Sequence, residues 1–325
     1  MHRRPAYRRE IEVKPSLRSQ ALNALLRLTL GRPLSGDDDV IALRRRYEKL
    51  DARQFRVQPP AERTPTMTGG VPGEWVAAPD ARLDRVVLYL HGGSFAFRFP
   101  NAHAALAARI GGPLRARTLL PDYRLSPEHP FPAAVEDCHA AYRGLLAQGV
   151  APRNIVLAGD SAGGNLALVT LTRVRAAGEP LPACAVLLSP ALDCTLGSPS
   201  MAEFDGRDPM IRLASLLVLR RLYVPSPHQY TEPEVSPLFA DFRGLPPLLF
   251  QAGTTELLRD EATRAADRAF AAGVDVELEL WPGVAHVFQL AGFLPEARRA
   301  IDHIVRFVRR RTGWSDAGTG LAAAD

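Results

Sequence analysis

The alternation of short apolar runs with longer helical patterns limits the fold of this chain more than any other feature. Beyond residue 73 the apolar runs have the length of single strands, and apolar residues recur at helical spacing between most of them. Strands that alternate with helices indicate βαβ units, so we expect an α/β fold with a mainly parallel sheet covered by helices on both faces. The expected strands are 85–90, 117–120, 154–159, 183–189, 247–251 and 276–281, and the expected helices are 102–110, 132–146, 162–176, 260–272 and 295–311.

Other segments depart from this alternation. Residues 16–30 and 40–50 have apolar residues at helical spacing, and Ser16 is placed to cap the first of these helices. Residues 59–73 are rich in proline and glycine and are expected to form a link. Residues 195–239 contain one helical pattern among many prolines, and we interpret them as an insertion over the sheet.

A serine stands at the sharpest turn that the sequence predicts. Gly159-Asp160-Ser161-Ala162-Gly163 follows one expected strand directly and opens the next expected helix. This G-x-S-x-G pattern between a strand and a helix is typical of a nucleophile elbow, which holds the serine hydroxyl at a helix N-terminus. Ser161 is therefore predicted to be a catalytic nucleophile. The alternative is a glycine-rich turn with an incidental serine, and a phosphate-binding loop is excluded because no Gly-Lys-Ser/Thr follows.

A serine nucleophile needs donors for the negative charge that develops on the substrate oxygen. The sequence His91-Gly92-Gly93-Ser94 follows the expected strand 85–90, where an α/β enzyme with this elbow supplies its second donor. The backbone amides of Gly92, Gly93 and Ala162 are predicted to form this oxyanion hole, and one such donor is typically worth about 10²–10³ in rate. The alternative for the two glycines is an ordinary turn. We expect His91 to shape the loop rather than to act as a base.

A base and an acid should follow the serine in the order Ser, acid, His. His228 lies in the insertion and His303 in the terminal helix, whereas His286 lies in the loop after the last expected strand. His286 is therefore the predicted base. Glu256 is the first carboxylate after the preceding strand, and it is predicted to orient the imidazole. Asp260, at the start of the next helix, is left open as an alternative acid.

Taken together, these motifs resemble the bacterial hormone-sensitive-lipase-like family of α/β-hydrolases. The resemblance runs from about residue 86 to residue 288 and is carried by HGG at 91–93, DYRLSPEHPFPAA at 122–134, GDSAGGN at 159–165, and the segments 252–261 and 283–288. It implies an α/β-hydrolase fold and the hydrolysis of carboxylic esters with short to medium acyl chains, without a cofactor. Two residues depart from the family pattern: Ser94 stands where a third glycine is frequent, and Glu256 where aspartate is more common.

The resemblance also implies a cap built from the N-terminal helices and the insertion. The expected organisation is cap helices in 1–50, a catalytic core in 51–194 and 236–313, a cap insertion in 195–235 and a disordered tail in 314–325. The cap residues expected to close a shallow apolar acyl site are Leu17, Leu25 and Leu28 on one side and Leu216, Leu217, Leu219 and Tyr223 on the other.

Composition excludes several other classes of function. The formal net charge is +5, but the basic runs at 3–4, 44–46 and 309–311 are far apart, so no nucleic-acid partner is expected. No run of apolar residues is long enough to span a membrane. The three cysteines lack metal-ligand spacing and are interpreted as reduced thiols, which predicts a cytoplasmic location and no metal.

The expected partner is a small-molecule ester, and a homodimer is left open. A lactonase or a deacetylase of a secondary metabolite would use the same acyl-enzyme and is an alternative within the same class. A receptor on the same fold, as in the plant gibberellin receptors that resemble this family, is an alternative of a different class. Those receptors lack the triad histidine, so His286 favours the enzyme.

Overall fold

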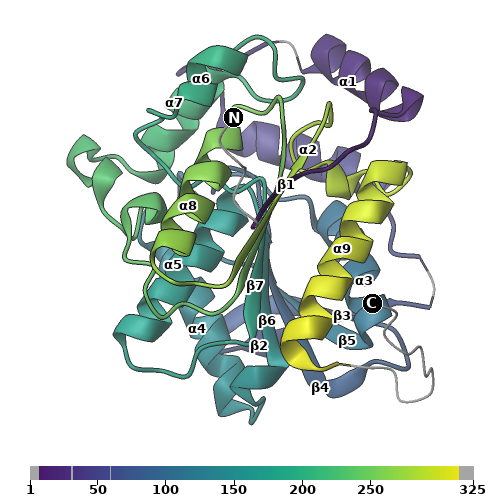
Figure 1. Ribbon diagram of the computed structural model, residues 1–325. Helices are drawn as coiled ribbons and strands as arrows, with labels where there is room; N and C mark the ends of the chain where they lie inside the picture. The colour runs from purple at the N-terminus through teal and green to yellow at the C-terminus, as the bar shows by residue number, and fades with distance from the viewer. Residues whose placement is uncertain (1–6, 31, 59, 315–325) are drawn as a thin grey trace.

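One sheet of strands lies between two layers of helices (Figure 1). The structure is a computed structural model that describes residues 7–30, 32–58 and 60–314. Within these residues the sheet has nine strands in the order β1-β9-β8-β7-β6-β4-β5-β3-β2. The strands are β1 (Arg8–Glu10), β2 (Glu62–Thr68), β3 (Val71–Ala77), β4 (Arg82–Leu90), β5 (Ala116–Pro121), β6 (Ile155–Asp160), β7 (Cys184–Leu188), β8 (Leu248–Gly253) and β9 (Val276–Trp281). Strand β3 runs antiparallel to β2 and β5, and all other neighbours are parallel.

The helices divide between the two faces of the sheet and its carboxyl end. Helices α4 (Ala133–Ala147), α5 (Ala162–Ala176) and α8 (Arg259–Ala271) cover one face, and α3 (Pro100–Leu114) and α9 (Pro295–Thr312) cover the other (Figure 1). The helices beyond the sheet are α1 (Leu17–Thr29), α2 (Val40–Gln54), α6 (Pro199–Phe204) and α7 (Leu213–Tyr223). Short 3-10 turns occupy Pro152–Asn154, Pro227–Thr231, Pro237–Phe239 and Phe288–Leu290.

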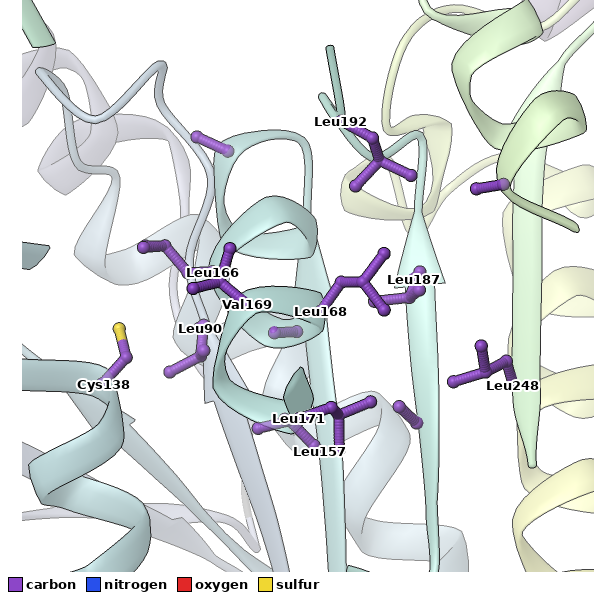
Figure 2. Close-up of a cluster of buried hydrophobic side chains, with 14 of the residues drawn as sticks. Leu90, Cys138, Leu157, Leu166, Leu168, Val169, Leu171, Leu187, Leu192 and Leu248 are labelled. Atoms are coloured by element: carbon purple, nitrogen blue, oxygen red, sulfur yellow. The ribbon is translucent and has the colours of Figure 1, made fainter. Parts of the chain in front are cut away.

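Side chains that alternate along the strands feed both core layers. In β4, Leu88 and Leu90 join the cluster under α4, α5 and α8, whereas Val87 and Tyr89 join the cluster under α3 and α9. All four are fully buried, which explains why such strands are continuous apolar runs rather than alternating ones. Figure 2 shows leucines of α5, including Leu168, packed among leucines of β4, β6 and β7.

The main sequence predictions for the fold are confirmed. The six expected strands are β4 to β9, and the five expected core helices are α3, α4, α5, α8 and α9, with small shifts at their ends. Ser16 caps α1 as expected, because its hydroxyl oxygen accepts the amide of Ser19 at 3.1 Å.

The expected link at 59–73 is wrong for most of its length, because β2 and β3 form a hairpin there. Gly69 and Gly70 make its turn with φ of +62° and +80°, a conformation that glycine adopts without steric cost. Pro65 is tolerated because β2 lies at the edge of the sheet, where one side of the strand has no neighbour.

Both ends of the described chain contribute to the fold, one by extending the sheet and the other by packing in a core layer. Residues 8–10, expected within the cap helices, form β1 along β9 and are too few to carry a periodic signal. Trp314, expected to begin a disordered tail, is only 4% exposed and packs in the cluster under α3 and α9. The rest of that expected tail, 315–325, lies outside the described residues.

Helix α1 presents the three leucines named for the cap to solvent, so the expectation that these three help to close an acyl site is wrong. Leu17, Leu25 and Leu28 are 82%, 55% and 84% exposed. The helix instead turns Ser19 and Asn23 inward, and both side chains donate hydrogen bonds to the carbonyl of Gly283, at 3.2 and 2.8 Å. These polar contacts set the rotation of the helix.

Truncation of one buried leucine of α5 tests the core. Leu168→Ala should lower the free energy of unfolding by about 2–5 kcal/mol, because the fully buried side chain leaves a cavity in the layer under α5. Leu83→Ala is the control, since Leu83 is 76% exposed and its loss should change stability by no more than about 0.5 kcal/mol. Urea unfolding followed by circular dichroism measures both, and equal stabilities would contradict this packing.

Candidate active site

Ser161 occupies a strained turn between β6 and α5. Its φ is +52° and its ψ is −120°, a backbone conformation that residues with a side chain rarely adopt. The turn is held from both sides, because the Ser161 amide donates to Leu188 O at 2.8 Å and the Ser161 carbonyl accepts the Ala191 amide at 3.0 Å. Strain of this kind persists only where surrounding contacts impose it, which is the geometry of a nucleophile elbow.

The glycines of the motif are required by close backbone approach. A Cβ on Gly163 would collide with the carbonyl oxygens of Leu90 and His91, and a Cβ on Gly159 would collide with the carbonyl of Gly163. Helix α5 therefore begins directly against the end of β4, and its first amide, that of Ala162, lies beside the loop that follows β4.

In that loop, the amide of Gly92 is already engaged. It donates a hydrogen bond to Asp160 Oδ1 at 3.0 Å, so it is not free for a substrate oxygen. The predicted role of Gly92 as an oxyanion donor is therefore wrong. Gly93, with φ of +124°, and Ser94, with φ of +54°, follow it. Neither of their amides donates to an acceptor within the described part of the chain.

Asp160 organises this loop from a fully buried position. Its carboxylate accepts the Tyr89 hydroxyl at 2.8 Å and lies 3.2 Å from His103 Nε2, in addition to the Gly92 amide. Burial acts to raise the pKa of Asp160, but the charge and hydrogen bond of His103 outweigh it and hold the pKa below its usual value. Burial likewise opposes the charge on His103, yet Asp160 leaves the pKa of His103 raised.

His91 shapes the loop after β4. Its ring stacks on Tyr123 with centroids 4.2 Å apart, and its Nδ1 lies 2.8 Å from the carbonyl oxygen of Gly92. Burial, reinforced by the nearby His103, lowers the pKa of His91 to about 4, so the ring is neutral near pH 7. The Tyr123 hydroxyl donates to the His91 carbonyl at 2.6 Å, which gives the 122–134 motif a structural role beside this loop.

His286 and Glu256 form a buried pair at the ends of β9 and β8. His286 Nδ1 lies 2.8 Å from Glu256 Oε2, and the two residues are 6% and 0% exposed. Burial lowers the pKa of His286, but the hydrogen bond and charge of Glu256 outweigh it, and the pKa ends above 6.5. Burial raises the pKa of Glu256, although its hydrogen bond to His286 opposes the rise.

The other candidates of the sequence do not join this pair. Asp260 accepts the Ser200 amide at 3.0 Å and the Arg259 side chain at 2.8 Å, so it tethers α6 to the start of α8. His303 of α9 has its Nδ1 2.6 Å from Oε1 of Glu279 in β9. His228 is exposed in a 3-10 turn of the insertion.

The sequence did not predict the roles of two residues that support the site. Asp160 lies inside the recognised motif, but its role depends on Gly92 and His103, which are distant in the sequence. Asp208 of the insertion is fully buried and accepts the amide of Leu257, next to Glu256, at 2.9 Å. Within 7–30, 32–58 and 60–314, no group of three or more His, Cys, Asp or Glu side chains is arranged to hold a metal ion.

Tyr223 of α7 packs against the loop after β4. Its ring stacks on Phe95 with centroids 3.6 Å apart and an interplanar angle of 3°, and both rings are buried. Leu219, one turn earlier, is 6% exposed and packs with Phe97, whereas Leu217 remains 36% exposed. Of the expected cap residues, those of α7 nearest the core therefore cover the loop.

Comparisons with known proteins identify the family of the chain. A family model described as the alpha/beta hydrolase fold matches residues 87–290. An acetyl-hydrolase of Streptomyces hygroscopicus is 43% identical over 247 residues, which cover 75% of this chain and 82% of the relative. An esterase of Acinetobacter venetianus is 34% identical over 285 residues, which cover 87% of this chain and 93% of the relative.

Solved structures point to the same group. The crystal structure of an esterase from the bacterial hormone-sensitive lipase family superposes with a TM-score of 0.85 at 40% identity and covers 93% of this chain and 100% of that one. No helix in the described part of the chain combines the length and apolarity needed to cross a bilayer. With this coverage of both sequence and fold, the chain belongs to the bacterial hormone-sensitive-lipase family of α/β-hydrolases and is a carboxylic ester hydrolase.

Proposed function

We propose that Ser161, His286 and Glu256 hydrolyse small carboxylic esters through an acyl-enzyme intermediate. The observation that carries this proposal is the buried 2.8 Å contact between His286 Nδ1 and Glu256 Oε2, in a loop at the same end of the sheet as the strained elbow of Ser161. With its Nδ1–H donated to the carboxylate, the imidazole keeps Nε2 unprotonated and able to accept a proton.

The steps then balance around one proton. His286 Nε2 takes the hydroxyl proton while Ser161 Oγ attacks the ester carbonyl carbon. The carbon becomes tetrahedral, and the carbonyl oxygen becomes the oxyanion. Collapse of this intermediate breaks the bond to the alcohol, which leaves with the proton from His286. A water molecule gives a proton to His286 and attacks the acyl carbon, and Ser161 leaves with that proton.

The oxyanion is assigned to the amides of Gly93 and Ala162, with Ser94 as a neighbouring donor. Their support is that none of these amides is used within the described backbone, whereas the Gly92 amide is held by Asp160. In this assignment Gly92 positions the loop rather than touching the substrate, and donors that are fixed in advance need no reorganisation during reaction.

The substrate side is assigned to a cap formed by the helices within 1–50 and by the insertion 195–235. The Tyr223–Phe95 stack beside the oxyanion loop favours a short apolar acyl pocket, which fits esters of short to medium acids. The relative named acetyl-hydrolase keeps acetyl esters, and deacetylation as an alternative, within the expected range. A cytoplasmic location and a homodimer stay predictions.

Loss of the nucleophile is the first test. Ser161→Ala should abolish hydrolysis of p-nitrophenyl esters without loss of stability, because alanine keeps the buried backbone contacts and removes only the hydroxyl. A fluorophosphonate should label Ser161 in the native protein, as read by peptide mass spectrometry. Full labelling of the alanine variant would remove Ser161 from the site.

Neutralising the acid is the second test. Glu256→Gln should lower kcat at least about a hundredfold with near-normal KM, because the imidazolium loses its charged partner. Asp260→Asn is the matched control at the start of α8 and should affect mainly stability, by about 1 kcal/mol, because it weakens the contacts of Asp260 with the Ser200 amide and Arg259. An inactive Asp260→Asn beside an active Glu256→Gln would transfer the role to Asp260.

The pH profile gives a third test of the same pair. The base must be neutral to act, so kcat/KM should fall as the pH drops through the pKa of His286, which Glu256 holds above 6.5. In Glu256→Gln the raising charge is gone while the burial remains, and the acidic limb of the residual activity should move to lower pH. A limb that stays in place would contradict the coupling.

Chain length tests the acyl pocket. Across p-nitrophenyl esters, kcat/KM should rise about fourfold for each buried CH₂, which corresponds to about 0.8 kcal/mol of transition-state stabilisation. The rise should stop when the pocket is full, with the maximum at roughly four to eight carbons. A steady rise to long acids would indicate an open tunnel instead. Lactones and acetylated amines in the same panel would separate the alternative substrates.

A further inference from the structure

Ser189 joins the acid loop to the base loop. It follows β7 directly, is fully buried, and has a φ of +43°, in the left-handed region that favours glycine. Its hydroxyl donates to Glu256 Oε1 at 2.9 Å and accepts the amide of Val287 at 3.3 Å. One side chain therefore contacts the carboxylate that holds His286 and also the residue next to His286.

The same short segment also holds the nucleophile. Leu188 O and the Ala191 amide, on either side of Ser189, make the two backbone hydrogen bonds of Ser161. The Ser189 amide in turn donates to Gln251 O of β8 at 2.7 Å, so β8 fixes the start of the segment. Residues 188–191 thus touch all three loops of the proposed triad.

A glutamate acid depends on such a contact more than a shorter acid would. The additional methylene gives the carboxylate another rotatable bond, and the terminal torsion of glutamate is broad, so Oε2 faces His286 only if Oε1 is held. Two donors hold Oε1, the Gly253 amide and the Ser189 hydroxyl. The crowding is tight, because a Cβ on Gly253 would lie 2.8 Å from Oε1.

We propose that Ser189 is a positioning residue for catalysis, whose hydroxyl aligns the Glu256 carboxylate with His286 and fixes the base loop through the Val287 amide. The proposal rests on the triad assigned above. Ser189 itself does not touch the substrate. A buried serine with only a packing role is not expected to donate a hydrogen bond to the acid loop and accept one from the base loop.

Two substitutions separate the hydroxyl from the fold. Ser189→Ala removes both contacts, and Ser189→Gly removes them while suiting the positive φ. Both should lower kcat about tenfold to a hundredfold with KM nearly unchanged, since a hydrogen bond to a charged group is lost. Loss of activity in the glycine variant at an unchanged melting temperature would exclude an effect of folding. Either variant at full kcat would overturn the proposal.

The control is Ser236→Ala. Ser236 is also fully buried, and its hydroxyl likewise makes one donated and one accepted bond, to Tyr230 O at 2.6 Å and from the Cys194 amide at 2.7 Å. Among the described residues its hydrogen bonds reach none of the triad loops, so its loss should reduce stability and leave kcat unchanged. An equal fall of kcat in Ser236→Ala would show a general packing effect and overturn the proposal.

A double-mutant cycle with Glu256→Gln tests whether Ser189 acts through the acid. If it does, Ser189→Ala combined with Glu256→Gln should lose much less activity than the product of the two single losses, because residues that act as a unit are not additive. Multiplied losses would overturn the role of Ser189 and leave the triad intact. A fully active Glu256→Gln would instead overturn the acid assignment, and this proposal with it.

Discussion

The site depends on two carboxyl groups that lie where little water reaches. Asp160 and Glu256 are 2% and 0% exposed, and a buried charge is tolerated only when it is paired and hydrogen-bonded. Each meets this condition by drawing together loops from different strands. Asp160 binds Tyr89, His103 and the Gly92 amide and so fixes the loop after β4, while Glu256 binds His286, Ser189 and the Gly253 amide. The hydrogen bonds of these two carboxyl groups therefore fix the relative positions of the loops in the candidate site.

The parallel sheet explains why these loops meet at all. Strands β4, β6, β7, β8 and β9 end at the same edge of the sheet and are followed by Gly92, Ser161, Ser189, Glu256 and His286. Segments outside the sheet also bind the loops that follow β8 and β9. Asp208 of the insertion binds the Leu257 amide, and Ser19 and Asn23 of α1 bind the Gly283 carbonyl. The helices beyond the sheet thus contact the acid and base loops directly, and are not only a cover for the substrate.

Much of the fold could be read from the sequence because its core strands are buried on both faces. Such strands are continuous apolar runs, and the helices between them keep a clear period, so β4 to β9 were predictable. The edge strands were not, since Arg8–Glu10 has only three residues and the hairpin of Glu62–Thr68 carries a proline and exposed polar side chains. The face of α1 was also misjudged, because its buried side includes Ser19 and Asn23, which bond to the Gly283 carbonyl, whereas Leu17, Leu25 and Leu28 are exposed.

For the site, the sequence by itself determined the class of chemistry. A serine between glycines at a strand–helix junction, with HGG upstream and His286 downstream, leaves few alternatives. The backbone of the turn leaves no room for a Cβ at Gly159 or Gly163. Tertiary structure alone decided which groups meet. Glu256 and Asp260 both follow β8, yet one side chain turns to His286 and the other to Ser200. The Gly92 amide is bound by Asp160, 68 positions away, and the Ser189 hydroxyl is bound to Glu256, 67 positions away. Such pairings depend on the direction of a side chain in three dimensions, which spacing along a chain does not encode.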